Sequence, residues 1–136
     1  AASLMSRDNV PAPCSGLLFV ALEITCSRSM KDRRQVVRSL LDRIRRRWNV
    51  SAMDIGPDGS WSEVFLAVSA AASGVSMAEE RLHAVYSFLV EEEETGEYAI
   101  QYHWREVARY DDISHAKDKQ TDTKRNFTDA GKPHQE

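Results

Sequence analysis

Two hydrophobic periodicities alternate along this chain, and their order limits the folds that it can adopt. In residues 17–25, side chains such as Leu18, Val20 and Leu22 recur at every second position, as in a half-buried strand. In residues 30–48, apolar side chains recur at helical spacing instead. The full set of predicted elements is strands at 17–25, 49–55, 61–72 and 97–108, and helices at 30–48 and 76–92.

Cap and turn residues support this division. Ser29 with Asp32, and Ser76 with Glu79, have the spacing of capping boxes, which predicts that the two helices start at these serines. The run Gly56-Pro57-Asp58-Gly59 predicts a turn between the second and third strands. With right-handed crossovers, the order βαββαβ gives an α+β, ferredoxin-like fold. We therefore expect a four-stranded antiparallel sheet with both helices on one face.

Extensions flank the predicted domain at residues 17–110. Residues 1–16 hold few large apolar groups, and the tail at 111–136 is polar with Phe127 as its only aromatic residue. We expect the tail alone to be disordered, and Phe127 to be its partner-binding anchor in an assembly. No apolar run approaches the roughly 18 residues of a membrane span, so no membrane contact is expected.

Positive charge is concentrated in the first predicted helix. Residues 31–47 carry eight basic and two acidic side chains, whereas the whole chain has a net charge of −3. Such a segment predicts a local anionic partner, most commonly a nucleic-acid backbone, and arginine suits phosphate through its planar fork. The candidate RNA-binding residues are Lys31, Arg34, Arg38, Arg43, Arg45, Arg46 and Arg47. The alternative is a solvated helix face whose arginines pair with the glutamate-rich second helix.

Two aromatic residues belong to the opposite face of the predicted sheet. If Leu18 and Leu66 pack under the helices, then Phe19 and Phe65 point away from them on the two central strands. RNA-recognition motifs share this element order and stack bases on such aromatic residues. The third strand lacks the basic, glycine-rich consensus of those motifs, which favours a protein contact or a covering tail. Phe19, Phe65 and Phe127 are thus candidate partner-binding residues.

The sequence offers no catalytic or metal-binding motif. His83 and His103 do not stand at the sequence spacing of any catalytic or metal-ligand motif, and Cys14 and Cys26 do not form a metal motif. The patterns H-E-x-x-H and G-x-S-x-G and the phosphate-binding loop are absent. We therefore expect no enzyme activity, no catalytic residue, no metal, no cofactor and no small-molecule substrate.

The run from Ser29 to Ile55 carries a family resemblance. It reads S-M-K-D-R-R-Q-V-V-R-S-L-L-D-R-I-R-R-R-W-N-V-S-A-M-D-I. It resembles the pattern of the YlxP family of small bacterial proteins, S-L-K-D-K-R-x-V-V-x-S-L-x-D-R-x-R-x-R-F-N-V-S-x-x-E. The resemblance covers about residues 17–110, and Trp61 stands where that family has a tryptophan after the turn. Departures from the pattern include Met30 for Leu, Trp48 for Phe and Asp54 for Glu.

The resemblance implies a function as well as a fold. Members of the YlxP family have a ferredoxin-like fold and no established enzymatic activity, and their bacterial genes lie among genes for transcription and translation. This implies a non-catalytic role around the ribosome, as a subunit or assembly factor. The expected partners are rRNA and neighbouring ribosomal or assembly proteins. The first alternative is a protein–protein adaptor in a large complex without direct RNA contact, and the second is an uncharacterised small hydrolase. Bacterial members of the family are nearly all core, so the extensions of this chain, with a first residue that is not Met, suggest a mitochondrial protein, with the cytoplasm as the alternative location.

Overall fold

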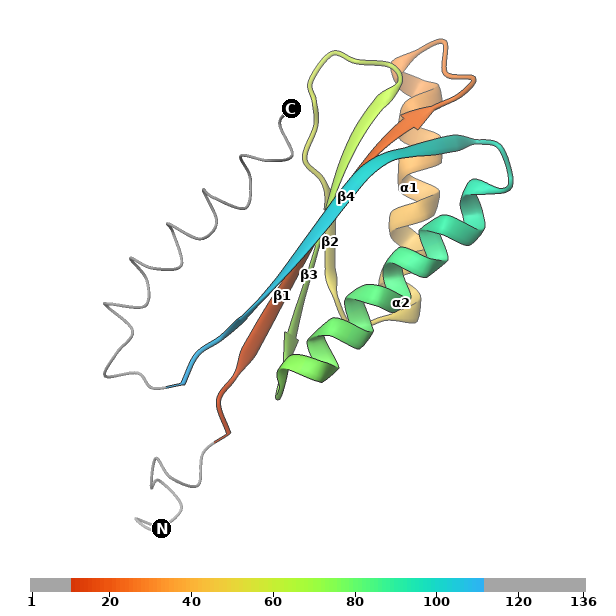
Figure 1. Ribbon diagram of the computed structural model, residues 1–136. Helices are drawn as coiled ribbons and strands as arrows, with labels where there is room; N and C mark the ends of the chain where they lie inside the picture. Colours follow the sequence, from red (N-terminus) through yellow and green to blue (C-terminus); the bar gives the residue numbers. More distant parts are fainter. Residues whose placement is uncertain (1–10, 112–136) are drawn as a thin grey trace.

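The computed structural model describes residues 11–111 and has the predicted element order (Figure 1). Residues 1–10 and 112–136 lie outside the described residues, and so do the predictions made for the tail and Phe127. The elements are β1 (Cys14–Ile24), α1 (Met30–Arg47), β2 (Ser51–Asp54), β3 (Glu63–Ala72), α2 (Val75–Glu93) and β4 (Tyr98–Arg109). The predicted βαββαβ order is confirmed.

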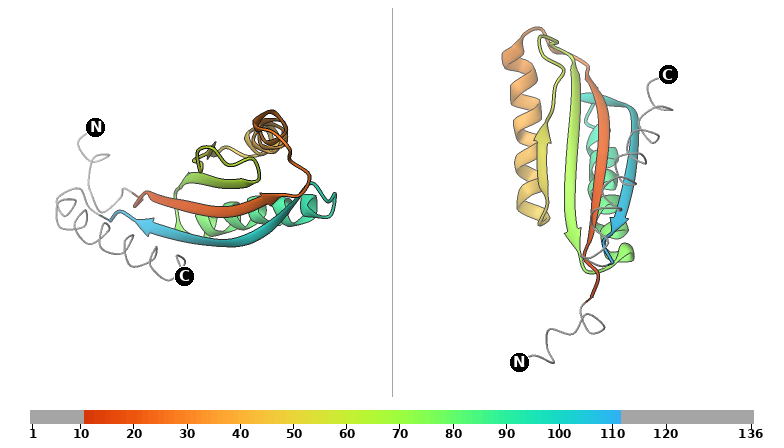
Figure 2. Two further views of the ribbon diagram at one scale, coloured as in Figure 1. Left: turned by 90° about the horizontal axis from the view of Figure 1, so that it is seen from above. Right: turned by 90° about the vertical axis from the view of Figure 1, so that its left-hand side faces the viewer.

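The strands form one antiparallel sheet in the order β2-β3-β1-β4. Both helices lie on the same side of this sheet, so the fold is ferredoxin-like (Figure 1). Helix α1 runs along β2, whereas α2 lies behind β1 and β4 (Figure 2). β2 is therefore an edge strand next to the basic helix.

The core fills the space between the sheet and the helices. Leu18, Val20 and Leu22 of β1 are buried on the helix-facing side, as the period-two pattern predicts. Helix α1 contributes Ile44 and α2 contributes Leu82, both fully buried. Burying each such side chain stabilises the fold by roughly 1.5–3 kcal/mol. The core therefore orients α1 so that its remaining faces are left for solvent or partners.

The start of α1 follows the prediction, but the start of α2 does not. Ser29 caps α1 by accepting a hydrogen bond from the Asp32 N–H at 3.1 Å. The Asp32 carboxylate accepts from the Arg28 N–H at 3.0 Å, which extends this cap by one residue. The capping box predicted at Ser76 is wrong, because Gly74 is the N-cap of α2 and makes no side-chain cap bond. β3 ends at Ala72 and α2 already begins at Val75, so Ser76 lies inside the first turn of the helix.

An irregularity in the β1–β4 pairing affects the face of the sheet that points away from the helices. Ala21 pairs with Tyr102, but Leu22 pairs with Ile100, so Gln101 is an extra residue in β4. Such a bulge shifts the alternation of a strand by one residue. As a result, Tyr102 faces away from the helices while Ile100 packs against the core.

Within residues 11–111, no helix is both long and apolar enough to cross a membrane.

Candidate nucleic-acid interface

Arg33 is the one basic residue of α1 that the fold buries. Its side chain is only 5 % exposed and forms a bidentate pair with Asp54 at 2.6 and 3.1 Å. It also donates to the carbonyl oxygens of Glu63 at 2.9 Å and Gly56 at 3.0 Å. Burial raises the pKa of Asp54, but the hydrogen bonds from Arg33 and the Gly56 N–H, with the charge of Arg33, hold it below its ordinary value. Arg33 is thus a structural residue.

The bonds of Arg33 order the β2–β3 loop, residues 55–62. The loop begins beside Gly56 and ends beside Glu63, and Arg33 holds a carbonyl at each end. Gly56 and Gly59 have φ angles of 121° and 83°, a region that favours glycine. Inside the loop, the hydroxyl of Ser60 accepts from the N–H groups of Ser62 at 3.3 Å and Glu63 at 3.0 Å. The loop is therefore bonded to the domain at both ends, and Ser60 braces it internally.

A depression of about 210 Å³ lies between α1 and β2. We call it the basic groove, and it is lined by Arg34, Val37, Arg38, Leu41, Arg45 and Asp54. Three of the six lining residues are arginines, and the only carboxylate, Asp54, is already paired with Arg33. The groove therefore presents net positive charge over an apolar floor.

The arginines of the groove are not equally available. Arg34 and Arg38 are exposed and form no ion pair within residues 11–111. The guanidinium of Arg45 donates to the Ala52 carbonyl oxygen through both Nε, at 3.1 Å, and Nη2, and it stands 4.0 Å from Asp42. Arg45 therefore fastens α1 to β2 and has less freedom to bind a ligand.

On the opposite flank of α1, the predicted pairing with the second helix occurs once. Arg43 forms an ion pair with Glu92 of α2, and its guanidinium carbon lies 5.4 Å from the Phe88 ring centre. Arg47 lies over the Trp48 ring at 4.7 Å. Lys31 and Arg46 are exposed and form no ion pair within the described chain. Pairing with the second helix, as the alternative predicts, therefore occurs at Arg43 alone. Most of the other basic side chains of α1 are exposed.

The sheet face away from the helices carries an aromatic cluster. Phe19 lies at its centre, with ring centres 5.6 Å from Phe65, 5.7 Å from Tyr102 and 5.6 Å from Trp104. The structure places the predicted pair Phe19 and Phe65 together on this face. Tyr102 and Trp104 were missed by sequence reasoning, because their side of β4 depends on the bulge at Gln101.

The charged side chains around this aromatic cluster are acidic. Glu23, Glu63 and Glu106 occupy outward positions of β1, β3 and β4, and no Lys or Arg of the described strands shares that face. Nucleic-acid binding needs cations beside the stacking rings, so this face does not suit RNA. The cluster and the basic groove therefore belong to different kinds of surface.

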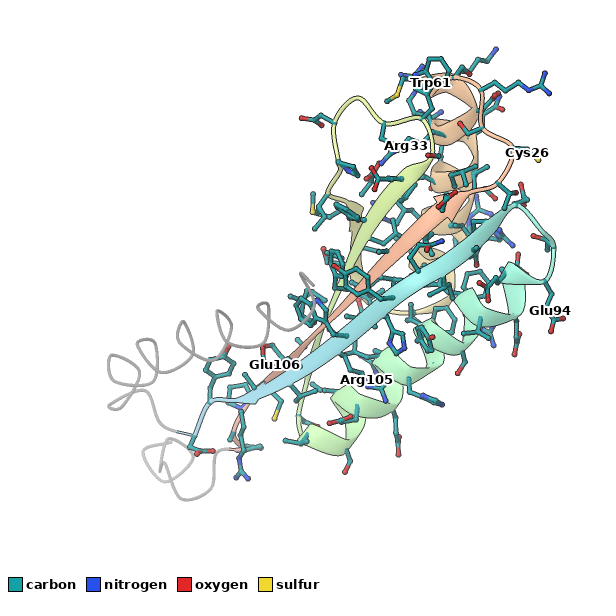
Figure 3. All side chains as sticks on the ribbon, turned by 45° about the horizontal axis from the view of Figure 1, so that its top comes forward. Cys26, Arg33, Trp61, Glu94, Arg105 and Glu106 are labelled. Carbon is teal, nitrogen blue, oxygen red and sulfur yellow. The ribbon has the colours of Figure 1, made fainter. Side chains whose placement is uncertain are left out.

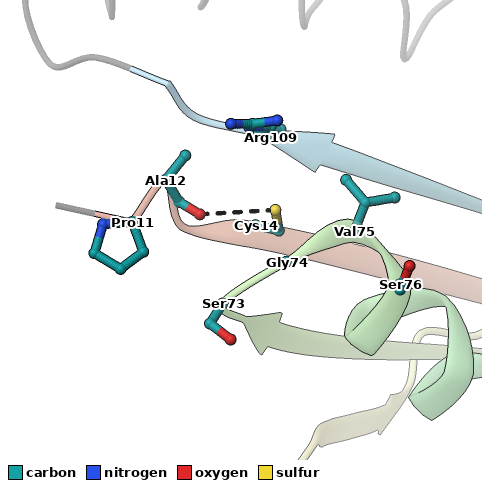
Figure 4. A pocket seen from close by; sticks show the side chains of 8 residues that line it. All are labelled: Pro11, Ala12, Cys14, Ser73, Gly74, Val75, Ser76 and Arg109. Atoms are coloured by element: carbon teal, nitrogen blue, oxygen red, sulfur yellow. Dashed lines mark hydrogen bonds between the residues drawn. The ribbon is translucent and has the colours of Figure 1, made fainter. Parts of the chain in front are cut away.

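A second cavity, of about 400 Å³, lies at the start of α2 (Figure 4). It is at the end of the sheet where Cys14 pairs with Ala72, whereas the β2–β3 loop is at the other end. Its lining includes Ser73, Ser76 and Arg109, and the Cys14 thiol there points toward the Ala12 carbonyl at 3.9 Å. Arg109 is engaged with Asp111 at 2.7 Å. The lining contains no acid–base pair, and residues 11–111 hold no group of three metal-ligating side chains.

A comparison with protein families places the chain among known sequences. A family model described as "Protein of unknown function (DUF503)" matches residues 16–102. The match spans more than half of the chain, so the chain belongs to this family. It includes α1, the β2–β3 loop and most of the aromatic cluster. A search of curated proteins finds no match.

Proposed function

We propose that this DUF503 protein is a non-catalytic RNA-binding protein of the ribosome, as a subunit or an assembly factor. The observation that carries the proposal is the line of exposed cations along one flank of α1. Lys31, Arg34 and Arg38 project from successive turns, and the paired Arg45 continues the line. At 1.5 Å per residue, the α1 cations left for a ligand extend over about 24 Å, from Lys31 to Arg47. A row of this length suits several phosphates of one RNA backbone.

The shape of the basic surface is better suited to binding an extended anion than a small ligand. The basic groove is open and shallow, and the cations continue beyond it to Arg46 and Arg47 at the end of α1. A small anion would be enclosed by a few convergent donors, whereas a polyphosphate backbone contacts many separate ones. The ribosomal assignment and the finer name YlxP come from the resemblance of residues 29–55. The mitochondrial location remains a prediction from the sequence.

A salt titration with matched variants tests RNA binding. The binding variant is Arg34→Gln/Arg38→Gln/Arg46→Gln, which removes three exposed cations of α1. The control, Arg81→Gln/Arg105→Gln/Arg109→Gln, removes the same charge from α2 and β4. Binding of an rRNA fragment would be measured across a salt series. Each lost phosphate contact should lower the slope of log affinity against log salt by about 0.7–0.9.

The control separates specific contacts from bulk charge. We expect the binding variant to lose about two or three units of slope, and the control to keep the wild-type slope. Equal slopes for all three proteins would contradict phosphate binding by α1. Circular dichroism of each variant establishes that the fold is intact before binding is compared.

A second candidate function, protein adaptor, is favoured by the aromatic cluster. Its rings are bordered by Glu23, Glu63 and Glu106, so it fits a protein segment with an apolar centre and flanking Lys or Arg. Met53, 53 % exposed, points outward on β2 beside this cluster. If the adaptor role is the correct one, Met53→Asp should abolish association with ribosomal particles, while the triple arginine variant should associate normally.

A further inference from the structure

We infer that Trp61 is a base-stacking residue, and that RNA bound along α1 presents an unpaired base to its indole ring. This inference rests on the proposed function and adds the class of RNA that the site prefers. Trp61 is 54 % exposed, more than any other large hydrophobic side chain within residues 11–111. Stacking on an aromatic side chain is sequence-tolerant, because every base has a π face.

The backbone that carries Trp61 is ordered. Arg33 bonds the carbonyl oxygens of Gly56 and Glu63 on either side of the loop, and Ser60 bonds the two residues after Trp61. The Ser62 carbonyl oxygen also accepts from the Ile24 N–H at 2.7 Å, which ties the loop to β1. An exposed indole on a fixed backbone loses little conformational freedom when it binds. The loop therefore holds a large flat surface in place.

Trp61 lies at the end of the molecule where the basic side of α1 begins. Arg33 contacts the loop directly, and the exposed Arg34 follows it in the same helical turn. Figure 3 shows Trp61 and Arg33 together at one end, with Arg105 and Glu106 in the other half. Cations that hold the backbone and a ring that stacks the base are the two components of single-strand binding. The neighbourhood of Trp61 combines them, whereas the aromatic cluster has no such cations.

The indole of Trp61 also differs from the other exposed rings in what surrounds it. Phe19, Phe65, Tyr102 and Trp104 pack against one another. No aromatic ring within residues 11–111 packs on Trp61. A ring engaged in a cluster must give up contacts to receive a base, but Trp61 need not.

The test compares two RNAs and three protein variants. The RNAs are a blunt duplex and the same duplex with an unpaired overhang. The variants are Trp61→Ala, Trp61→Phe and the control Tyr110→Ala, which removes another exposed ring. Tyr110 lies beside the start of β1 and Trp61 beside its end, roughly 33 Å apart along the strand. Affinities and salt slopes are measured for each pair.

We expect Trp61→Ala to weaken binding of the overhang RNA about 5- to 150-fold and to leave the blunt duplex unaffected. The salt slope should not change, because no phosphate contact is lost. Trp61→Phe should restore most of the affinity, and Tyr110→Ala should behave as wild type. The melting temperature of Trp61→Ala should match that of the wild type, because its side chain is exposed.

The possible failures are distinguishable. If the wild type binds neither RNA in a salt-dependent manner, both the proposed function and this inference are wrong. If binding is salt-dependent but Trp61→Ala changes neither affinity, only the inference is overturned. Equal weakening of both RNAs would overturn it too, because stacking on an unpaired base requires the overhang.

Discussion

Replacing Arg33 with Met should destabilise the domain severely. The methionine keeps much of the aliphatic volume but removes four hydrogen bonds, to Asp54 (two), Glu63 and Gly56. The Asp54 carboxylate then loses its charge partner, and two carbonyl oxygens of the loop boundaries lose their donor. Breaking a buried ion pair from one side costs about 3–5 kcal/mol. Because the Asp54 side chain is 26 % exposed and can recover some water, we expect the lower end, about 3 kcal/mol.

The neighbouring residue provides the control. Arg34→Met makes the same chemical change one position later, at an exposed site with no ion pair within residues 11–111. It should change the free energy of unfolding by no more than about 0.5 kcal/mol. Thermal unfolding followed by circular dichroism should therefore show Arg33→Met melting about 10 °C or more below Arg34→Met. Equal melting temperatures would refute a structural role for Arg33.

Three further predictions concern the same framework. The folded-state pKa of Asp54 is held below its ordinary value of 3.8, so the ionised carboxylate stabilises the folded state. This stabilisation is complete at pH values well above 3.8 and is lost as the pH falls below 3.8 and through the folded-state pKa. Urea unfolding between pH 5 and pH 2 should therefore show the stability gap between wild type and Asp54→Asn narrowing toward acid; a constant gap would contradict the pairing. Tyr98→Phe should cost about 1–2 kcal/mol in urea unfolding, because the buried hydroxyl donates to the Leu89 carbonyl oxygen; an unchanged midpoint would contradict this bond. Arg45→Gln should lower stability by about 1 kcal/mol through its lost bonds to Ala52, whereas Arg46→Gln should lower only RNA affinity. Equal stability of these two variants would show that Arg45 does not fasten β2.

The fold could be predicted from the sequence because the hydrophobic pattern repeats within each helix and strand. The alternation through Leu18, Val20 and Leu22 places one face of β1 in the core whatever its neighbours are. The start of α2 was not predictable from the Ser76 spacing, because the geometry of the β3–α2 turn decides the cap, and it selects Gly74. Likewise, Tyr102 could not be assigned to a face until the bulge at Gln101 was known.

The structural role of Arg33 could be predicted in part from the sequence. It precedes Val37, Leu40 and Ile44 by four, seven and eleven residues, so it lies on the apolar stripe of α1. Its charge hid this signal, because seven other basic side chains surround it in residues 31–47. The partner Asp54 lies 21 residues away, beyond the rest of α1 and the turn that leads into β2, and no spacing rule predicts that pairing. A basic residue on an apolar stripe is a signal to look for a distant carboxylate.

The fold divides the basic run into three groups, and this division limits how RNA can bind. Arg33 is buried, and Arg43 and Arg45 are engaged with Glu92 and with the Ala52 carbonyl oxygen. The five cations left for a ligand are Lys31, Arg34, Arg38, Arg46 and Arg47. At about 0.9 per phosphate contact, five contacts limit the salt slope on duplex RNA to roughly 4–5, whereas all eight would give about 7. A measured slope near 7 would therefore require the paired arginines to leave their partners, and the domain would have to rearrange when it binds.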